Sequence, residues 1–142
     1  MADRVLVATS RYYEKISLEL EAGADAVLSA AGAVVETIEV PGAFELPGII
    51  AMAADSAKYD GYVALGCVVR GETSHYDYVC GESARGLMHL ATERRLAIGY
   101  GILTVENQDQ AWVRADRSQG NKGRDAAEAC LAMLAFRRKF CR

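Results

Sequence analysis

The chain has 142 residues, of which 51% are hydrophobic and 25% are charged, and its formal net charge is −3. This length fits one domain with a substantial core, and the composition is that of a soluble globular protein rather than a disordered one. The acidic balance argues against a nucleic-acid-binding surface, because the basic run at residues 137–139 is more typical of a helix end.

Two strand–helix units are expected in the first third of the chain. Residues 5–9 form a short apolar run that predicts a buried strand, and a helix with one apolar face should follow and end at Gly32. The residues on that face are Ile16, Leu20, Ala24, Val27, Leu28 and Ala31. A second strand over residues 34–40 should stop at Pro41, and Pro47 suits the first turn of a helix that runs towards Ala57.

Two further units follow. A third strand is expected over residues 61–69, and its helix should bury Val79, Ala84, Leu87, Met88 and Ala91. A fourth strand over residues 98–104 runs into Asn107, which with Gln110 makes a capping-type start for a short helix over residues 108–115. A last helix should place Ala127, Cys130, Leu131 and Leu134 on one side.

This alternation predicts an α/β fold with a four-stranded parallel sheet and helices on both faces, a three-layer αβα sandwich of flavodoxin-like type. No internal repeat or linker divides residues 1–142, so a single domain is expected.

The segment from Gly66 to Cys80 combines a strand end with polar side chains that suit chemistry. Ser74 and Asp77 have the spacing of a capping box, so a helix should begin at His75. Its first-turn N–H groups, with Thr73, would face the crevice beyond the strand, where a helix amino end favours an anion such as phosphate. Histidine titrates near neutrality and can move protons there. The plainer alternative is a capped helix with a histidine on its surface.

Other kinds of site are disfavoured. Residues 10–13 lack the glycine-rich turn of a dinucleotide site, and residues 120–123 lack the preceding strand of a P-loop. Four cysteines without C-x-x-C spacing and two histidines make a metal site improbable. With no targeting segment and no apolar run near the roughly 18 residues of a membrane span, a cytoplasmic protein is expected.

Several motifs occur together across nearly the whole chain. They are residues 41–47 (PGAFELP), residues 64–71 (ALGCVVRG) with Thr73, residues 75–80 (HYDYVC), residues 101–104 (GILT) with Glu106 and Asn107, and residues 120–123 (GNKG). In this order they resemble the lumazine synthase family of riboflavin biosynthesis.

The resemblance implies condensation of 5-amino-6-(D-ribitylamino)uracil with 3,4-dihydroxy-2-butanone 4-phosphate to 6,7-dimethyl-8-ribityllumazine, with release of phosphate and water and without a metal or organic cofactor. It also implies a homopentamer with active sites between adjacent subunits, and the short segment before the first strand favours a free pentamer over a larger shell.

The resemblance implies roles for particular residues. His75 matches the acid–base histidine, and Glu72 and Thr73 match the phosphate loop, with Arg114 as the arginine that clamps the phosphate from the neighbouring subunit. The residues implied for the ribitylaminouracil are Tyr12 for stacking, Ala43, Phe44 and Glu45 for the ribityl amine, Cys67, Val68 and Val69 along the strand, and Tyr100 from the neighbouring subunit.

Taken singly, these residues have plainer explanations: Tyr12 and Tyr100 as core or interface aromatics, and Arg114 as a surface charge. The chain also departs from the family. Tyr12-Tyr13 replaces a Phe-Asn type pair, Glu72 brings a carboxylate that must point away from the phosphate, and Ser118 stands where lysine is frequent, with Arg117 as a candidate replacement. A Cys–His nucleophile is disfavoured because Cys67 lies within the strand.

Two other hypotheses for the function stay open. One is a paralogue that binds lumazine or flavin, or forms a shell, without useful turnover. The other is a generic phospho-ligand-binding domain of flavodoxin-like type, which would be a monomer.

Overall fold

The computed structural model describes residues 1–141, and their alternation of strands and helices is the predicted one. The elements are β1 (Arg4–Ser10), α1 (Glu14–Ala30), β2 (Val34–Val40), the 3₁₀ helix η1 (Ala43–Glu45), α2 (Leu46–Asp55), β3 (Gly61–Val69), α3 (His75–Glu93), β4 (Ala97–Val105), α4 (Gln108–Ala115) and α5 (Lys122–Phe140). The four strands pair in parallel in the order β2-β1-β3-β4, which confirms the predicted fold class.

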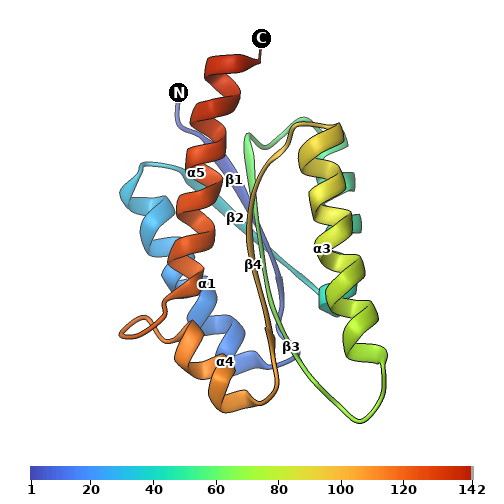
Figure 1. The fold of residues 1–142 in the computed structure, drawn as a ribbon. Helices are drawn as coiled ribbons and strands as arrows, with labels where there is room; N and C mark the ends of the chain where they lie inside the picture. The colour runs from blue at the N-terminus through green and yellow to red at the C-terminus, as the bar shows by residue number, and fades with distance from the viewer. Residues whose placement is uncertain (142) are drawn as a thin grey trace.

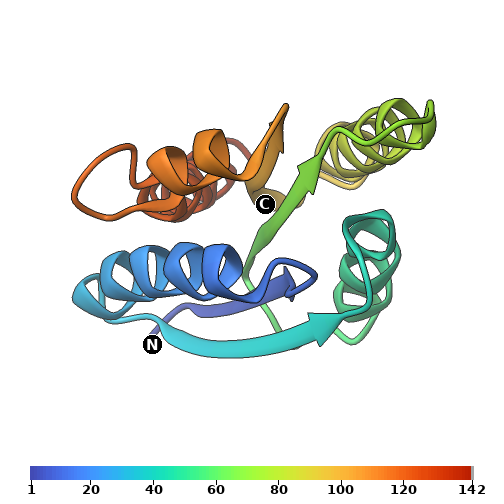
Figure 2. The same ribbon diagram turned by 90° about the horizontal axis from the view of Figure 1, so that it is seen from below.

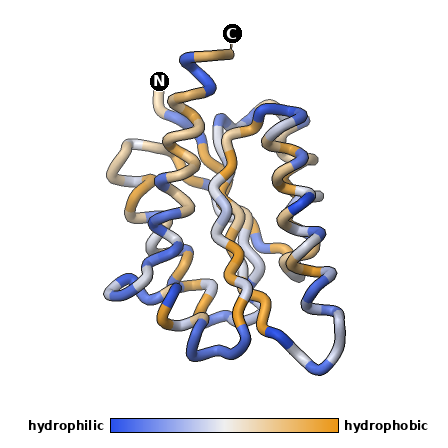
Figure 3. The backbone as a smooth tube through the Cα atoms, viewed as in Figure 1, coloured by the Kyte–Doolittle hydropathy of each residue, from blue (hydrophilic) through white to orange (hydrophobic). Residues whose placement is uncertain are grey.

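Helices cover both faces of this sheet (Figures 1 and 2). On one face, Val5 and Val63 pack in a core with Leu20 of α1 and Ala127 of α5. On the other face, alternate strand residues such as Leu6 pack against α2 and α3. Successive side chains of a strand point to opposite faces, and both faces are covered here. The two central strands β1 and β3 therefore each contain a continuous apolar run. In Figure 3 the sheet is mostly orange and white, while blue is concentrated on the helices and loops.

Some details of helix packing differ from the prediction. Gly32 ends α1 with φ +79°, as expected, but Ala31 is exposed. In α3 the buried residues are Val79, Ser83, Leu87 and Leu90, while Met88 is 62% exposed. Met88 follows Leu87 by about 100° around the helix, so it faces away from the sheet when Leu87 faces it. No helix among residues 1–141 is long and apolar enough to cross a membrane.

Helix α5 lies unusually close to its neighbours. A Cβ on Gly99 of β4 would overlap the backbone carbonyl of Ala126, and a Cβ on Gly123 would overlap the backbone carbonyl of Leu20 in α1. The carboxyl end of α5 is also tied to the start of β1, because Arg138 forms an ion pair with Asp3. These contacts fix α5 against both the sheet and α1.

The variant Gly99→Ala should therefore destabilise the protein by at least about 2 kcal/mol, because the new methyl group overlaps backbone atoms that cannot move aside. Chemical denaturation gives the free energy of unfolding. Gly81→Ala is the matched control, since open space surrounds that position within α3. The control should leave stability unchanged or raise it by up to about 1 kcal/mol. Equal stability of the two variants would contradict the close packing of α5.

Candidate active site

A cavity of about 710 Å³ lies at the carboxyl ends of the strands. Its walls come from Ser10 at the end of β1 with Tyr12 and Tyr13 after it, residues 41–45 after β2, residues 67–69 at the end of β3, and the loop before α3 with the first turns of that helix. From β1 the chain passes to β2 on one side and later to β3 on the other. Such a switch in direction leaves a crevice between adjacent strand ends, where open α/β sheets bind ligands.

The end of β3 contributes backbone as well as side chains. The ladder between β1 and β3 ends at Thr9 and Leu65, whereas β3 continues beside β4 to Val69. The last four residues of β3 therefore extend past the pairing with β1, beside the cavity that Cys67, Val68 and Val69 line. Backbone groups along this edge are available to a ligand.

Nine of the twelve predicted site residues line this cavity. They are Tyr12, Ala43, Phe44, Glu45, Cys67, Val68, Val69, Thr73 and His75. Tyr12 and Phe44 are large exposed rings, at 76% and 56% of their full exposure. The ring of Tyr12 is held edge-on against Tyr13, with centroids 5.0 Å apart. Aromatic surface at a cavity wall suits a flat heterocyclic ligand.

The other three predicted residues lie outside the cavity wall. Glu72 is exposed in the loop before α3. Tyr100 is 44% exposed on the edge strand β4. Arg114 is exposed in the last turn of α4, where its Nη1 donates to the backbone oxygen of Gln110 at 3.0 Å. The expected contribution of Tyr100 and Arg114 to a neighbouring chain's site stays a prediction.

The predicted capping box at the start of α3 was wrong, although the helix does begin at His75. Ser74 already has helical angles and makes no side-chain cap bond. Thr73 Oγ1 accepts the hydrogen bond from the backbone N–H of His75 instead, at 3.3 Å. Asp77 does not reach back either, because its carboxylate faces Arg70 Nη1 at 3.5 Å. Thr73 thus fixes the backbone beside the cavity.

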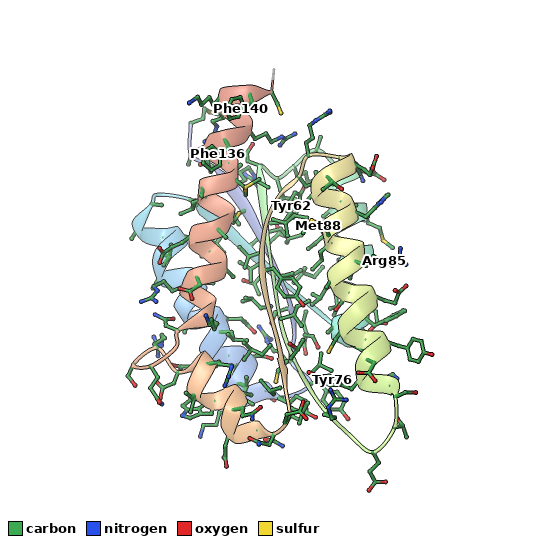
Figure 4. All side chains as sticks on the ribbon, in the orientation of Figure 1. Tyr62, Tyr76, Arg85, Met88, Phe136 and Phe140 are labelled. Atoms are coloured by element: carbon green, nitrogen blue, oxygen red, sulfur yellow. The ribbon has the colours of Figure 1, made fainter. Side chains whose placement is uncertain are left out.

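Arg70, to which the sequence motifs gave no role, lies in the chain between the cavity residues Val69 and Gly71. Its Nε lies 3.0 Å from both carboxylate oxygens of Glu106, which follows β4. Its guanidinium lies 4.3 Å from the ring centroid of Tyr76, and its backbone N–H donates to Val105. Figure 4 shows Tyr76 at the first turn of α3, beside the strand ends. Arg70 thereby joins the ends of β3 and β4 to the start of α3.

The start of α4 agrees with the predicted capping. Asn107 Oδ1 accepts from the backbone N–H of Gln110 at 2.9 Å, and Gln110 Oε1 accepts from that of Glu106 at 2.8 Å. After this helix, Arg117 Nε forms an ion pair with Glu19 of α1 at 3.1 Å. Arg117 is the candidate to replace the lysine charge that Ser118 lacks, and its guanidinium is paired with Glu19 instead. Arg117 also lowers the pKa of Glu19, mainly through hydrogen bonds.

The cavity holds a cysteine that is not activated. Burial raises the pKa of Cys67 to about 11, so its thiol stays protonated at neutral pH. This agrees with the rejection of a Cys–His nucleophile. Among residues 1–141, no group of three or more histidine, cysteine or acidic side chains is placed to hold a metal ion.

Comparison with known proteins gives a consistent picture. Residues 2–138 match the family model for 6,7-dimethyl-8-ribityllumazine synthase. The chain is 54% identical over 137 residues to the 6,7-dimethyl-8-ribityllumazine synthase of Bartonella tribocorum, covering 96% of this chain and 91% of the relative. It is 54% identical to that of Novosphingobium aromaticivorans, covering 96% and 98%. It is 49% identical to 6,7-dimethyl-8-ribityllumazine synthase 1 of Rhizobium meliloti, covering 95% and 92%.

The buried thiol leads to a reactivity prediction. At pH 8, iodoacetamide should label Cys141, which is partly exposed near the end of α5, well before Cys67. The reason is that alkylation needs an accessible thiolate, and Cys67 gains that form only as the pH approaches about 11. Peptide mapping by mass spectrometry measures both sites. Labelling of Cys67 at the rate of Cys141 would mean that its thiol is activated.

Proposed function

The chain belongs to the 6,7-dimethyl-8-ribityllumazine synthase family, transferases of riboflavin biosynthesis, and on this premise we propose that it condenses 5-amino-6-(D-ribitylamino)uracil with 3,4-dihydroxy-2-butanone 4-phosphate. The products are 6,7-dimethyl-8-ribityllumazine, phosphate and water. The observation that carries the proposal is one cavity, at the switch point of the sheet, lined by nine residues expected to serve this reaction.

The chemistry sets the tasks of the site. An amine of the first substrate attacks the ketone of the second and expels water as an imine forms. Phosphate then leaves by elimination. The second nitrogen attacks the remaining carbonyl, and loss of a second water closes the ring. Each step moves protons, and the two substrates must be held in one geometry. The protein therefore needs a proton carrier beside an anion site, with a flat binding surface next to both.

His75 is proposed as the proton carrier. It is the first residue of α3 and lines the cavity, two residues after Thr73. The hydrogen bond from the His75 backbone N–H to Thr73 Oγ1 orders the chain between them. An imidazole in this place reaches groups on a ligand in the cavity and exchanges protons with them, as general acid–base catalysis requires.

The phosphate of the second substrate is proposed to bind at the amino end of α3. The helix has 19 residues, and its first-turn N–H groups with the Thr73 hydroxyl offer donors to an anion. Backbone of Glu72 would contribute, with its exposed carboxylate turned to solvent. Arg114 would add a guanidinium, the group best suited to a bidentate phosphate contact.

The proposed role of Arg114 requires a second chain. Arg114 and Tyr100 are exposed and stand outside the cavity of their own chain. If both residues serve the reaction, they do so in the cavity of an adjacent copy. We therefore propose a homopentamer with active sites between neighbouring subunits, in which β4 and α4 of one subunit close the cavity of the next.

The ribitylaminouracil is proposed to occupy the part of the cavity near β1 and η1. Its ring would stack on Tyr12, and the ribityl chain would lie along Ala43, Phe44 and Glu45, where the Glu45 carboxylate accepts hydrogen bonds from hydroxyls. Residues 67–69 would border the ring from β3.

Replacing His75 by alanine should lower the turnover number by about a hundredfold or more, because the proton carrier is lost. The appearance of lumazine fluorescence from the two substrates measures the rate. His89→Ala is the matched control, since this second histidine is exposed later on the same helix and away from the cavity. The control should keep wild-type turnover. If His75→Ala did so too, the assignment of the proton carrier would fail.

Replacing Arg114 by alanine should raise the KM for the phosphate substrate about tenfold or more and leave the KM for the amine substrate unchanged, because a charge-assisted contact to phosphate is lost. Arg124→Ala removes the same charge from an exposed arginine of α5 paired with Asp125 and is the control.

Coexpression of His75→Ala and Arg114→Ala chains tests the shared site directly. Mixed assemblies would contain some interfaces with both native residues. At concentrations of the phosphate substrate well below its KM, activity should therefore exceed that of either variant alone. No recovery, or a wild-type protein that sediments as a monomer, would rule out the shared site. Tight lumazine binding without turnover by the wild type would instead indicate a non-catalytic paralogue.

A further inference from the structure

One buried polar atom on the wall of the cavity has no partner. Ser10, the last residue of β1, is 1% exposed and lines the cavity. No hydrogen-bond partner for its Oγ is found among residues 1–141. A buried hydroxyl without a partner is costly, and buried polar groups in folded proteins are nearly always hydrogen-bonded. The exception at Ser10 calls for a physical explanation.

The three other polar residues that are buried as whole residues in the described chain have hydrogen-bond partners. Thr9 Oγ1 donates to Glu21 at 3.0 Å, Ser17 Oγ donates to the backbone oxygen of Ser10 at 2.6 Å, and Ser83 Oγ donates to the backbone oxygen of Cys80 at 3.2 Å. None of these three lines the cavity. A second unpaired atom is Oδ1 of Asn121, the residue just before α5. It lies against Gly23 of α1, and Asn121 does not line the cavity.

The position of Ser10 suits contact with a ligand. A Cβ built on Gly66 would lie 3.6 Å from the Ser10 Cβ and 3.7 Å from the Ala43 Cβ, so the three residues meet at one point where β3 extends past β1. Tyr12, the proposed stacking ring, follows two residues later. Thr73 and His75 belong to a different wall, on the loop before α3 and its first turn.

We propose that the Ser10 hydroxyl contacts the substrate, by a hydrogen bond to the polar edge of the uracil ring when the ring occupies the cavity. This proposal rests on the proposed function, which supplies the ligand. A pyrimidinedione edge carries carbonyl acceptors and N–H donors, and a serine hydroxyl can both donate and accept. Ligand binding would thereby give the unpaired hydroxyl the partner that the protein alone does not provide.

The location predicts a selective effect of Ser10→Ala. The KM for the amine substrate and the dissociation constant of lumazine, measured by fluorescence titration, should each rise about threefold to tenfold, the range of one neutral hydrogen bond. The KM for the phosphate substrate and the turnover number should stay at wild-type values. The melting temperature should not fall, because the lost hydroxyl had no partner in the unliganded protein.

Two further variants sharpen the test. Ser83→Ala removes an equally buried hydroxyl that does have a protein partner, so it should lower the melting temperature and leave lumazine affinity unchanged. Ser10→Cys keeps the shape of the side chain with a slightly larger atom and hydrogen-bonds weakly, so its lumazine affinity should lie between those of alanine and wild type.

The inference would be overturned if Ser10→Ala kept the lumazine affinity and the amine KM of the wild type. It would also be overturned if Ser10→Ala lowered the melting temperature and left lumazine affinity unchanged. If the wild type catalyses the condensation normally, either result removes the role of Ser10 and leaves the proposed function standing. A wild-type protein that neither forms nor binds lumazine would overturn both.

Discussion

The pairing of β1 with β3 is the constraint from which the site follows. Both strands are almost wholly buried, so their register is fixed by packing on two faces of the sheet. Within that register β3 is the longer strand at its carboxyl end, and it continues beside β4 after β1 has ended. The chain also leaves β1 towards β2, away from β3. These two facts leave an open space between the strand ends, and the cavity occupies it.

Charged and polar contacts then hold the rim of that space. Arg70 connects the strand ends to α3 through Glu106 and Tyr76. These groups are exposed, so their net contribution to folding stability is small, and their effect is to restrict the loop rather than to hold the core. The same strand ends lead into α4, whose first turn is tied to Glu106 through Gln110. In the proposed assembly, these contacts would connect the phosphate loop of a subunit to its own α4, the helix that contributes Arg114 to the neighbouring subunit's site.

The fold was predictable because its signals are local. Apolar runs separated by residues such as Gly32, Pro41 and Pro47 gave strand and helix boundaries to within a few residues. The wrong predictions concern side chains whose orientation depends on tertiary contacts. Met88 faces outward because Leu87 packs on the sheet, and Asp77 pairs with Arg70 instead of capping α3. Candidate site residues came mainly from family motifs, not from spacing. The contact between Arg70 and Glu106 and the unpaired hydroxyl of Ser10 were not predicted, because both depend on groups far away in the sequence.

The ion pair between Asp3 and Arg138 has a practical consequence. It holds the start of β1 and the last turns of α5 together. The N- and C-terminal ends of the described chain therefore lie near each other at the amino ends of the strands, opposite the cavity (Figure 1). A fluorophore or surface tether attached at either end would lie on the side of the protein opposite the cavity and leave the cavity mouth open to solvent. The protein could therefore be immobilised without blocking the entry of small molecules.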